Sequence, residues 1–70
     1  MTYKEFGARL KEIRKEKKIS RQEVAAAMGI KPNSYTSIES GLKGTNILKL
    51  PILAGLLGVS TDYLLGVSDI

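Results

Sequence analysis

The chain has 70 residues, a length at which folding buries only roughly 60% of the unfolded surface, so we expect a single domain over residues 1–70. It contains no cysteine and no histidine, which excludes disulfides and removes the commonest zinc ligand and the usual catalytic proton shuttle. We therefore expect no metal, no cofactor and no enzymatic activity. No apolar run approaches the roughly 20 residues that span a bilayer, and no secretory signal precedes the first helix, so we expect a cytoplasmic protein.

The net charge of +4 is distributed unevenly along the chain. Residues 1–21 contain eight basic and three acidic side chains, whereas residues 22–70 contain three basic and four acidic ones. A basic segment suits a polyanionic partner such as nucleic acid, although basic helix faces are also common in proteins without one. Charge alone leaves both interpretations open.

The first predicted element is a helix over about residues 2–17. Its apolar side chains recur at the spacing of one helix face: Tyr3, Phe6, Leu10 and Ile13. Thr2 and Glu5 have the spacing of a capping box, which marks the start of the helix. Gly7 is interpreted either as a point of close approach to another helix or as incidental.

Two short helices follow in quick succession. Ser20 and Glu23 repeat the capping-box spacing and begin a helix over residues 21–28, which Gly29 ends in the left-handed conformation. Pro32 suits the first position of the next helix, over residues 32–40, because a proline there lacks an N–H that has no partner anyway. The inner positions of the two helices are Val24, Ala25, Met28, Tyr35 and Ile38.

The outward stripe of the helix over residues 32–40 is neutral and polar. It consists of Asn33, Thr36, Ser37 and Ser40. Exposed helix faces usually carry charged side chains, so this stripe indicates a binding surface, with a plain solvated face as the alternative.

The C-terminal half predicts a fourth and a fifth helix. Apolar residues at helical spacing run from Ile47 to Leu57, with Asn46 as a plausible N-cap and Pro51 as an interruption. Either this helix begins near Leu50, or residues 46–50 form a separate turn. Ser60 then caps a short helix over residues 61–65.

Together these elements predict an all-α, compact five-helix fold with a helix-turn-helix over about residues 20–40. A tight turn containing glycine, followed by a helix with a polar outer stripe, is typical of the DNA-binding form of that motif. The major groove, about 12 Å wide, admits one such helix.

Five motifs stand in order along the chain: FGARLKEIR at residues 6–14, ISRQEVA at 19–25, MGI at 28–30, SIESG at 37–41 and LGVSTDYLLG at 57–66. With these motifs the chain resembles the lambda-repressor/Cro-type (Xre-like) helix-turn-helix family over residues 3–66, and its last motif is similar to small prophage-type repressors. The resemblance implies a DNA-binding, compact lambda-repressor-like domain whose recognition helix lies at residues 32–40.

By position, the resemblance implies three groups of functional residues. The base-contacting positions are Pro32, Asn33, Thr36 and Ser37. The phosphate-contacting positions are Arg21, Lys31, Ser34, Ser40 and Lys43. A structural salt bridge joins Arg14 to Glu39.

Three departures from the family pattern bear on the loop geometry and on the operator sequence, but not on the fold. Pro32 replaces a residue that usually offers a polar side chain, which leaves Asn33 as the bidentate reader, with adenine as its natural target. Thr45 stands where the family often has proline, and Pro51 interrupts the fourth helix.

The sequence favours a transcriptional repressor that binds double-stranded DNA at a pseudo-palindromic operator as a homodimer. The candidate dimer surface is apolar and C-terminal, unless these side chains complete the core: Leu56, Tyr63, Leu65, Val67 and Ile70. The alternatives are an autoregulating antitoxin and a helical protein-interaction adaptor without DNA affinity. A protein partner would be an antirepressor or, for an antitoxin, a toxin.

Overall fold

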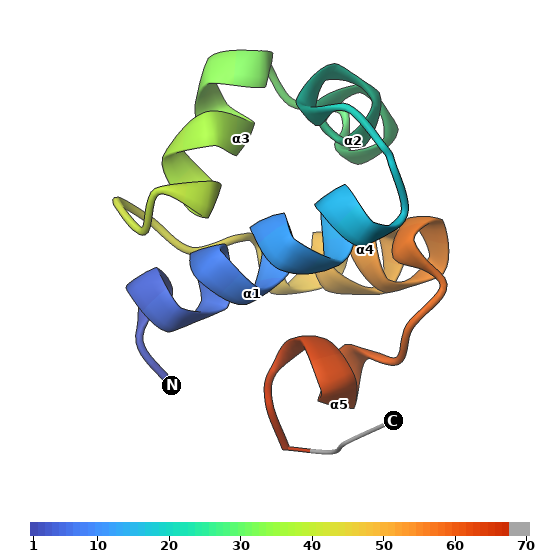
Figure 1. Ribbon diagram of the computed structural model, residues 1–70. Helices are drawn as coiled ribbons and strands as arrows, with labels where there is room; N and C mark the ends of the chain where they lie inside the picture. Colours follow the sequence, from blue (N-terminus) through green and yellow to red (C-terminus); the bar gives the residue numbers. More distant parts are fainter. Residues whose placement is uncertain (68–70) are drawn as a thin grey trace.

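A computed structural model describes residues 1–67, so the predicted dimer residue Ile70 lies outside the described residues. The order of elements is α1 (Tyr3–Glu16), α2 (Arg21–Met28), α3 (Pro32–Glu39), the 3-10 helix η1 (Ile47–Lys49), α4 (Leu50–Leu57) and α5 (Thr61–Leu64) (Figure 1). The described part of the chain contains no strand. The predicted all-α, five-helix fold is therefore confirmed.

The predicted capping boxes begin α1 and α2. The Thr2 hydroxyl accepts from the Glu5 N–H at 3.1 Å, and the Glu5 carboxylate accepts from the Thr2 N–H at 3.0 Å. Ser20 and Glu23 make the same reciprocal pair at 3.1 and 3.2 Å. Each box satisfies backbone donors that a helix start would otherwise leave without a partner.

The turn between α2 and α3 is short, and its conformation is fixed. Gly29 takes the left-handed conformation, with φ 71°, where glycine avoids the steric penalty of a Cβ atom. The following N–H, of Ile30, donates to the Ala25 carbonyl at 3.0 Å and closes the end of α2. Pro32 then occupies the first position of α3, after Lys31. The direction of α3 is thus set by local stereochemistry.

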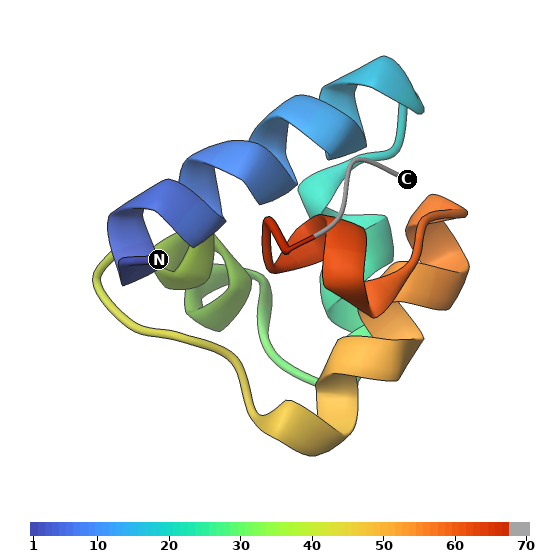
Figure 2. The ribbon, with the colours of Figure 1, turned by 90° about the horizontal axis from the view of Figure 1, so that it is seen from below.

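One core joins all five α-helices. Its fully buried large side chains come from every one of them: Leu10, Val24, Met28, Tyr35, Leu53, Leu57 and Leu64. Figure 2 shows α5 lying across the side of the molecule between α1 and α4, against both of which it packs. In the described part of the chain, no helix is long and apolar enough to cross a membrane.

Gly7 lies where α1 passes the C-terminal end of α3. A Cβ atom added at Gly7 would stand 2.5 Å from the Glu39 carbonyl oxygen and closer still to that of Ile38. The backbones of α1 and α3 therefore touch at this point, and the close-approach interpretation of Gly7 is the correct one.

The predicted fourth helix is divided. Residues 47–49 form η1, capped by the Asn46 side chain, which accepts from the Leu48 N–H at 2.8 Å. The α-helix begins at Leu50, so Pro51 falls in its first turn, where its missing N–H breaks no helical bond.

This division overturns the expectation that Ile47 is an inner residue. Its side chain is 77% exposed, because the tighter 3-10 turn puts it out of register with the apolar stripe of α4. Tyr3, expected on the inner stripe of α1, is also exposed.

Candidate nucleic-acid interface

α3 separates into an inner and an outer face. Tyr35, Ile38 and Glu39 are buried, whereas Pro32, Asn33 and Thr36 are exposed and Ser37 is half-buried. The four residues predicted to contact bases therefore lie on one accessible side of the helix. No charged side chain stands among them.

The hydroxyl groups of this outer face donate their protons to their own helix. Thr36 Oγ1 donates to the Pro32 carbonyl at 3.0 Å, and Ser37 Oγ donates to the Asn33 carbonyl at 3.1 Å. Ser40 Oγ donates to the Ser37 carbonyl at 3.0 Å. Sequence reasoning missed these bonds, although serine and threonine inside helices commonly bond to a carbonyl one turn back.

Beneath the outer face, the Glu39 carboxylate accepts hydrogen bonds from three helices. Arg14 of α1 donates through Nε to Oε2 at 2.6 Å and through Nη2 to Oε1 at 3.3 Å. Tyr35 donates its hydroxyl to Oε2 at 2.5 Å, and Arg21 of α2 donates through Nε to Oε1 at 3.2 Å. Arg14 Nη1 also donates to the Ile19 carbonyl at 2.9 Å, so the same guanidinium holds the segment before α2.

The pKa values of this cluster favour the ion pair. Burial alone would raise the pKa of the Glu39 carboxyl, but hydrogen bonds from Arg14 and Tyr35, with the nearby positive charge, hold that pKa below its usual value. The hydrogen bond to Glu39 raises the pKa of Arg14. Burial, and then the bond to the Glu39 carboxylate, raises the pKa of Tyr35. Glu39 is therefore an anion and Tyr35 a neutral donor at neutral pH.

Arg21 combines two environments. Its Nε is bound to the buried Glu39, yet 46% of its side chain is exposed at the start of α2. Sequence reasoning placed Arg21 at a phosphate and missed the pairing with Glu39, because that contact depends on how α2 and α3 cross.

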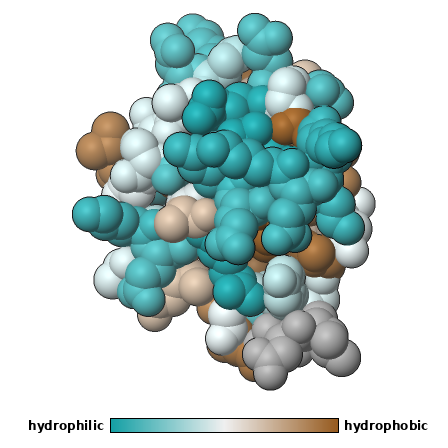
Figure 3. All heavy atoms as spheres, viewed as in Figure 1, coloured by the Kyte–Doolittle hydropathy of each residue, from teal (hydrophilic) through white to brown (hydrophobic). Residues whose placement is uncertain are grey.

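The other predicted phosphate contacts lie around α3. Lys31 and Ser40, which flank the helix, and Lys43 in the following loop are exposed. Ser34 and Lys43 line a common groove of about 160 Å³ between α3 and that loop. Figure 3 shows the face over α1 as largely hydrophilic.

The predicted dimer residues do not share one environment. Leu56, Leu65 and Val67 are exposed, whereas Tyr63 is partly buried against the core. Arg9 covers the Tyr63 ring at 4.4 Å from its centroid and donates through Nε to the Tyr63 carbonyl at 2.6 Å. Tyr63 thus completes the core, as the alternative interpretation allowed.

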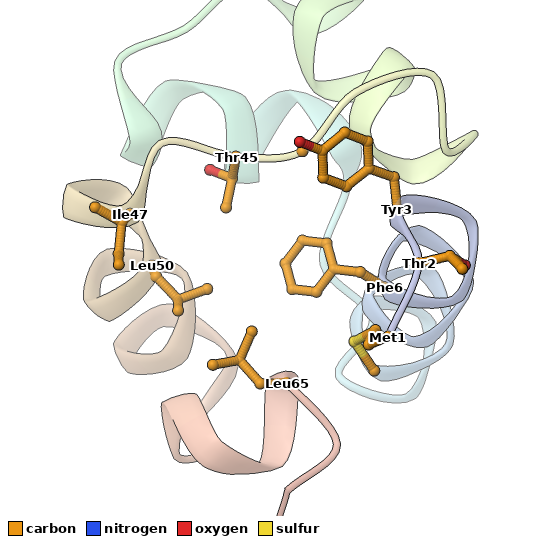
Figure 4. A pocket seen from close by; sticks show the side chains of 9 residues that line it. Met1, Thr2, Tyr3, Phe6, Thr45, Ile47, Leu50 and Leu65 are labelled. Atoms are coloured by element: carbon orange, nitrogen blue, oxygen red, sulfur yellow. The ribbon is translucent and has the colours of Figure 1, made fainter.

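Leu65 belongs to an apolar cavity that the sequence did not indicate. The cavity, of about 280 Å³, lies between the start of α1, the segment before α4 and the end of α5. Figure 4 shows Phe6 of α1, Leu50 of α4 and Leu65, which follows α5, pointing into it. Three further apolar side chains are exposed in the connection between α3 and α4: Leu42, Ile47 and Leu48. Sequence reasoning did not single out Leu42 and Leu48, and it expected Ile47 to face inward.

Comparison with known families matches this arrangement. The helix-turn-helix family model matches residues 10–64, which include α2, the Gly29 turn and α3. The chain belongs to the helix-turn-helix family, among the regulators of the Xre and Cro/CI type. The family resemblance inferred from the sequence is therefore confirmed.

Its similar curated relatives are proteins of Bacillus subtilis (strain 168). The uncharacterized HTH-type transcriptional regulator YobD is 41% identical over 61 residues, which are 87% of this chain and 54% of YobD. The SPbeta prophage-derived uncharacterized HTH-type transcriptional regulator YonR is 42% identical over 60 residues, 86% of this chain and 56% of YonR. The HTH-type transcriptional regulator AnsR is 40% identical over 58 residues, 83% of this chain and 50% of AnsR. The chain thus spans about half the length of the curated relatives it matches.

Proposed function

We propose that the chain binds double-stranded DNA in a sequence-specific manner and represses transcription from a pseudo-palindromic operator. α3 enters the major groove, which is about 12 Å wide and admits a single helix. The observation that carries this proposal is the construction of α3: a neutral polar outer face above a carboxylate that fixes the helix to both α1 and α2. A helix surface of short, uncharged hydrogen-bonding side chains suits the donors and acceptors that base edges present in the major groove.

The proposed contacts divide into two sets. Pro32, Asn33, Thr36 and Ser37 face the bases, with Asn33 paired to an adenine. The phosphate contacts surround them: Arg21, Lys31, Ser34, Ser40 and Lys43. Among these, Ser40 must first release its hydroxyl proton from the Ser37 carbonyl, because a phosphate offers only acceptors.

A homodimer would place two α3 helices in successive major grooves, about 34 Å apart. The exposed apolar side chains of the C-terminal region, Leu56, Leu65 and Val67, are the proposed contact between the two copies. Repression then follows if the bound dimer occludes a promoter.

The proposal is tested by selecting bound sequences from random DNA and titrating the selected site and an unrelated duplex at several salt concentrations. Asn33→Ala should weaken binding to the selected site by roughly 1–3 kcal/mol and leave the unrelated duplex nearly unaffected. Arg21→Ala should weaken both and reduce the slope of log affinity against log salt by about one unit.

Three results would contradict the proposal or its assignments. Absence of DNA affinity even at low salt would exclude the function and favour an adaptor that only binds proteins. Equal losses on both duplexes would remove Asn33 from the base contacts, and an unchanged salt slope would remove Arg21 from the phosphate contacts.

A further inference from the structure

We propose that Thr36 and Ser37 read the operator as hydrogen-bond acceptors, so that each selects a base with an exocyclic amino group, adenine or cytosine, over guanine or thymine on the contacted strand. This inference rests on the proposed function and specifies the base class read by the outer face of α3.

The assignment starts from the hydroxyl protons. A hydroxyl group has one proton and two acceptor lone pairs. In Thr36 the proton lies on the Pro32 carbonyl at 3.0 Å, and in Ser37 it lies on the Asn33 carbonyl at 3.1 Å. What each oxygen has left to offer outside the helix is its lone pairs.

If a hydroxyl turned to donate to a base, it would lose its hydrogen bond within α3. If Thr36 donated to a base, its bond to the Pro32 carbonyl would be broken, and the contact would replace one hydrogen bond with another. Accepting from a base adds a bond and keeps the first one. Because the two bonds coexist only when the base is the donor, the acceptor mode is favoured at both positions.

In the major groove, the bases differ in whether the exocyclic group that they present donates or accepts a hydrogen bond. Adenine N6 and cytosine N4 are donors, whereas guanine O6 and N7 and thymine O4 are acceptors. A side chain that only accepts therefore separates amino bases from keto bases on the strand it faces. Asn33 can both donate and accept, which matches adenine, another amino base.

The absence of charged side chains from the outer face also favours the acceptor assignment. Guanine is usually read by the donors of arginine or lysine, and the outward stripe of α3 contains neither residue. Arg21 is tied through Nε to Glu39, and Lys31 precedes the helix. The centre of α3 thus offers acceptors where a guanine would need donors.

The test uses the selected operator with single base analogues. At each adenine or cytosine in turn, the amino group is deleted by replacing adenine with purine or cytosine with pyrimidin-2-one. Affinities are measured for the unmodified chain, for Thr36→Val, which keeps the side-chain shape but lacks the hydroxyl, and for Ser37→Ala. Thr36→Ser is the matched control that keeps a hydroxyl at position 36.

We expect one amino deletion to weaken the unmodified chain and Thr36→Ser by about threefold to tenfold more than it weakens Thr36→Val. A second, different position should show the same coupling to Ser37→Ala. Circular dichroism spectra of the three variants check that α3 still forms.

The inference is overturned at a residue if its substitution couples to no amino group. It is equally overturned if coupling appears instead when guanine O6 is removed by substitution with 2-aminopurine, since the hydroxyl would then be a donor. In both cases the chain would still bind its selected operator with a salt-dependent affinity, and the proposed function would be unaffected. Failure to enrich any sequence would instead count against the proposed function itself, and the acceptor assignment would fall with it.

Discussion

The two connections on either side of α3 differ in length and in how firmly their conformation is fixed. The one before it, residues 29–31, is fixed by the left-handed Gly29, the Ile30–Ala25 hydrogen bond and Pro32. The one after it is longer and exposes the apolar side chains of Leu42, Ile47 and Leu48, each more than three-quarters exposed. The first connection determines where α3 points, whereas the second supplies little of the core.

The two connections differ in what their residues do for stability. The short connection fixes the start of α3, and Glu39 and Gly7 fix the C-terminal part of α3 to α1. The long one contacts the helix-turn-helix through Lys49, whose Nζ donates to the Met28 carbonyl at 2.6 Å. Substitutions near the anchors of α3 should therefore destabilise the fold, whereas substitutions of the exposed apolar side chains in the long connection should not.

The largest effect is expected for Glu39→Gln. It leaves the buried Arg14 guanidinium without a counterion, and removing one partner of a buried ion pair typically lowers the free energy of unfolding by about 3–5 kcal/mol. Urea denaturation measures the loss. Glu12→Gln, which removes the same charge from an exposed position of α1, is the control. Equal effects of the two substitutions would show that the Glu39 cluster does not anchor α3.

Acid should act on the same carboxylate. The pKa of Glu39 is lowered in the folded chain, so its contribution to stability is fully present above the ordinary glutamate pKa. That contribution is lost as the pH falls through the lowered folded value. Thermal unfolding between pH 6 and pH 2.5 should show this loss, and Glu39→Gln should show a shallower dependence. A parallel dependence in both chains would contradict the assignment.

A smaller loss is expected for Gly7→Ala. The added Cβ atom would meet the Ile38 and Glu39 carbonyl oxygens, and overpacking of this kind costs about 1–3 kcal/mol. Gly55→Ala is a matched control, because a Cβ atom there meets nothing within 4 Å. In the middle of α4 it should stabilise the fold by about 0.5–1 kcal/mol. Effects of the same sign would show that α1 and α3 do not require backbone contact.

The smallest effect is expected in the long connection. Ile47→Ser should change the free energy of unfolding by no more than about 0.5 kcal/mol, as for other exposed positions. Leu53→Ala, at a fully buried position of α4, should lower it by about 2–5 kcal/mol. A loss at Ile47 that approaches the loss at Leu53 would remove the contrast between the two connections.

Local signals made most of the fold predictable. The pairs Thr2–Glu5 and Ser20–Glu23 marked helix starts, and Gly29 with Pro32 marked the turn, because each acts through bonds to its near neighbours in the chain. Periodicity failed at Ile47, since it assumes one helical pitch and the chain changes pitch between η1 and α4.

The candidate site was predictable in position but not in chemistry. The residues of the outer face followed from helical spacing and the family resemblance. The Arg21–Glu39 bond depends on how α2 and α3 cross, which spacing does not give. The direction of the Thr36 and Ser37 protons depends on side-chain rotation, which a residue name leaves open.

The separation of α3 into a buried anchor and a free outer face has an evolutionary consequence. Tyr35, Ile38 and Glu39 fix the helix from within, so new side chains at 33, 36 and 37 leave those bonds untouched. A lineage of such chains could therefore acquire new operators through a few exchanges while retaining one scaffold.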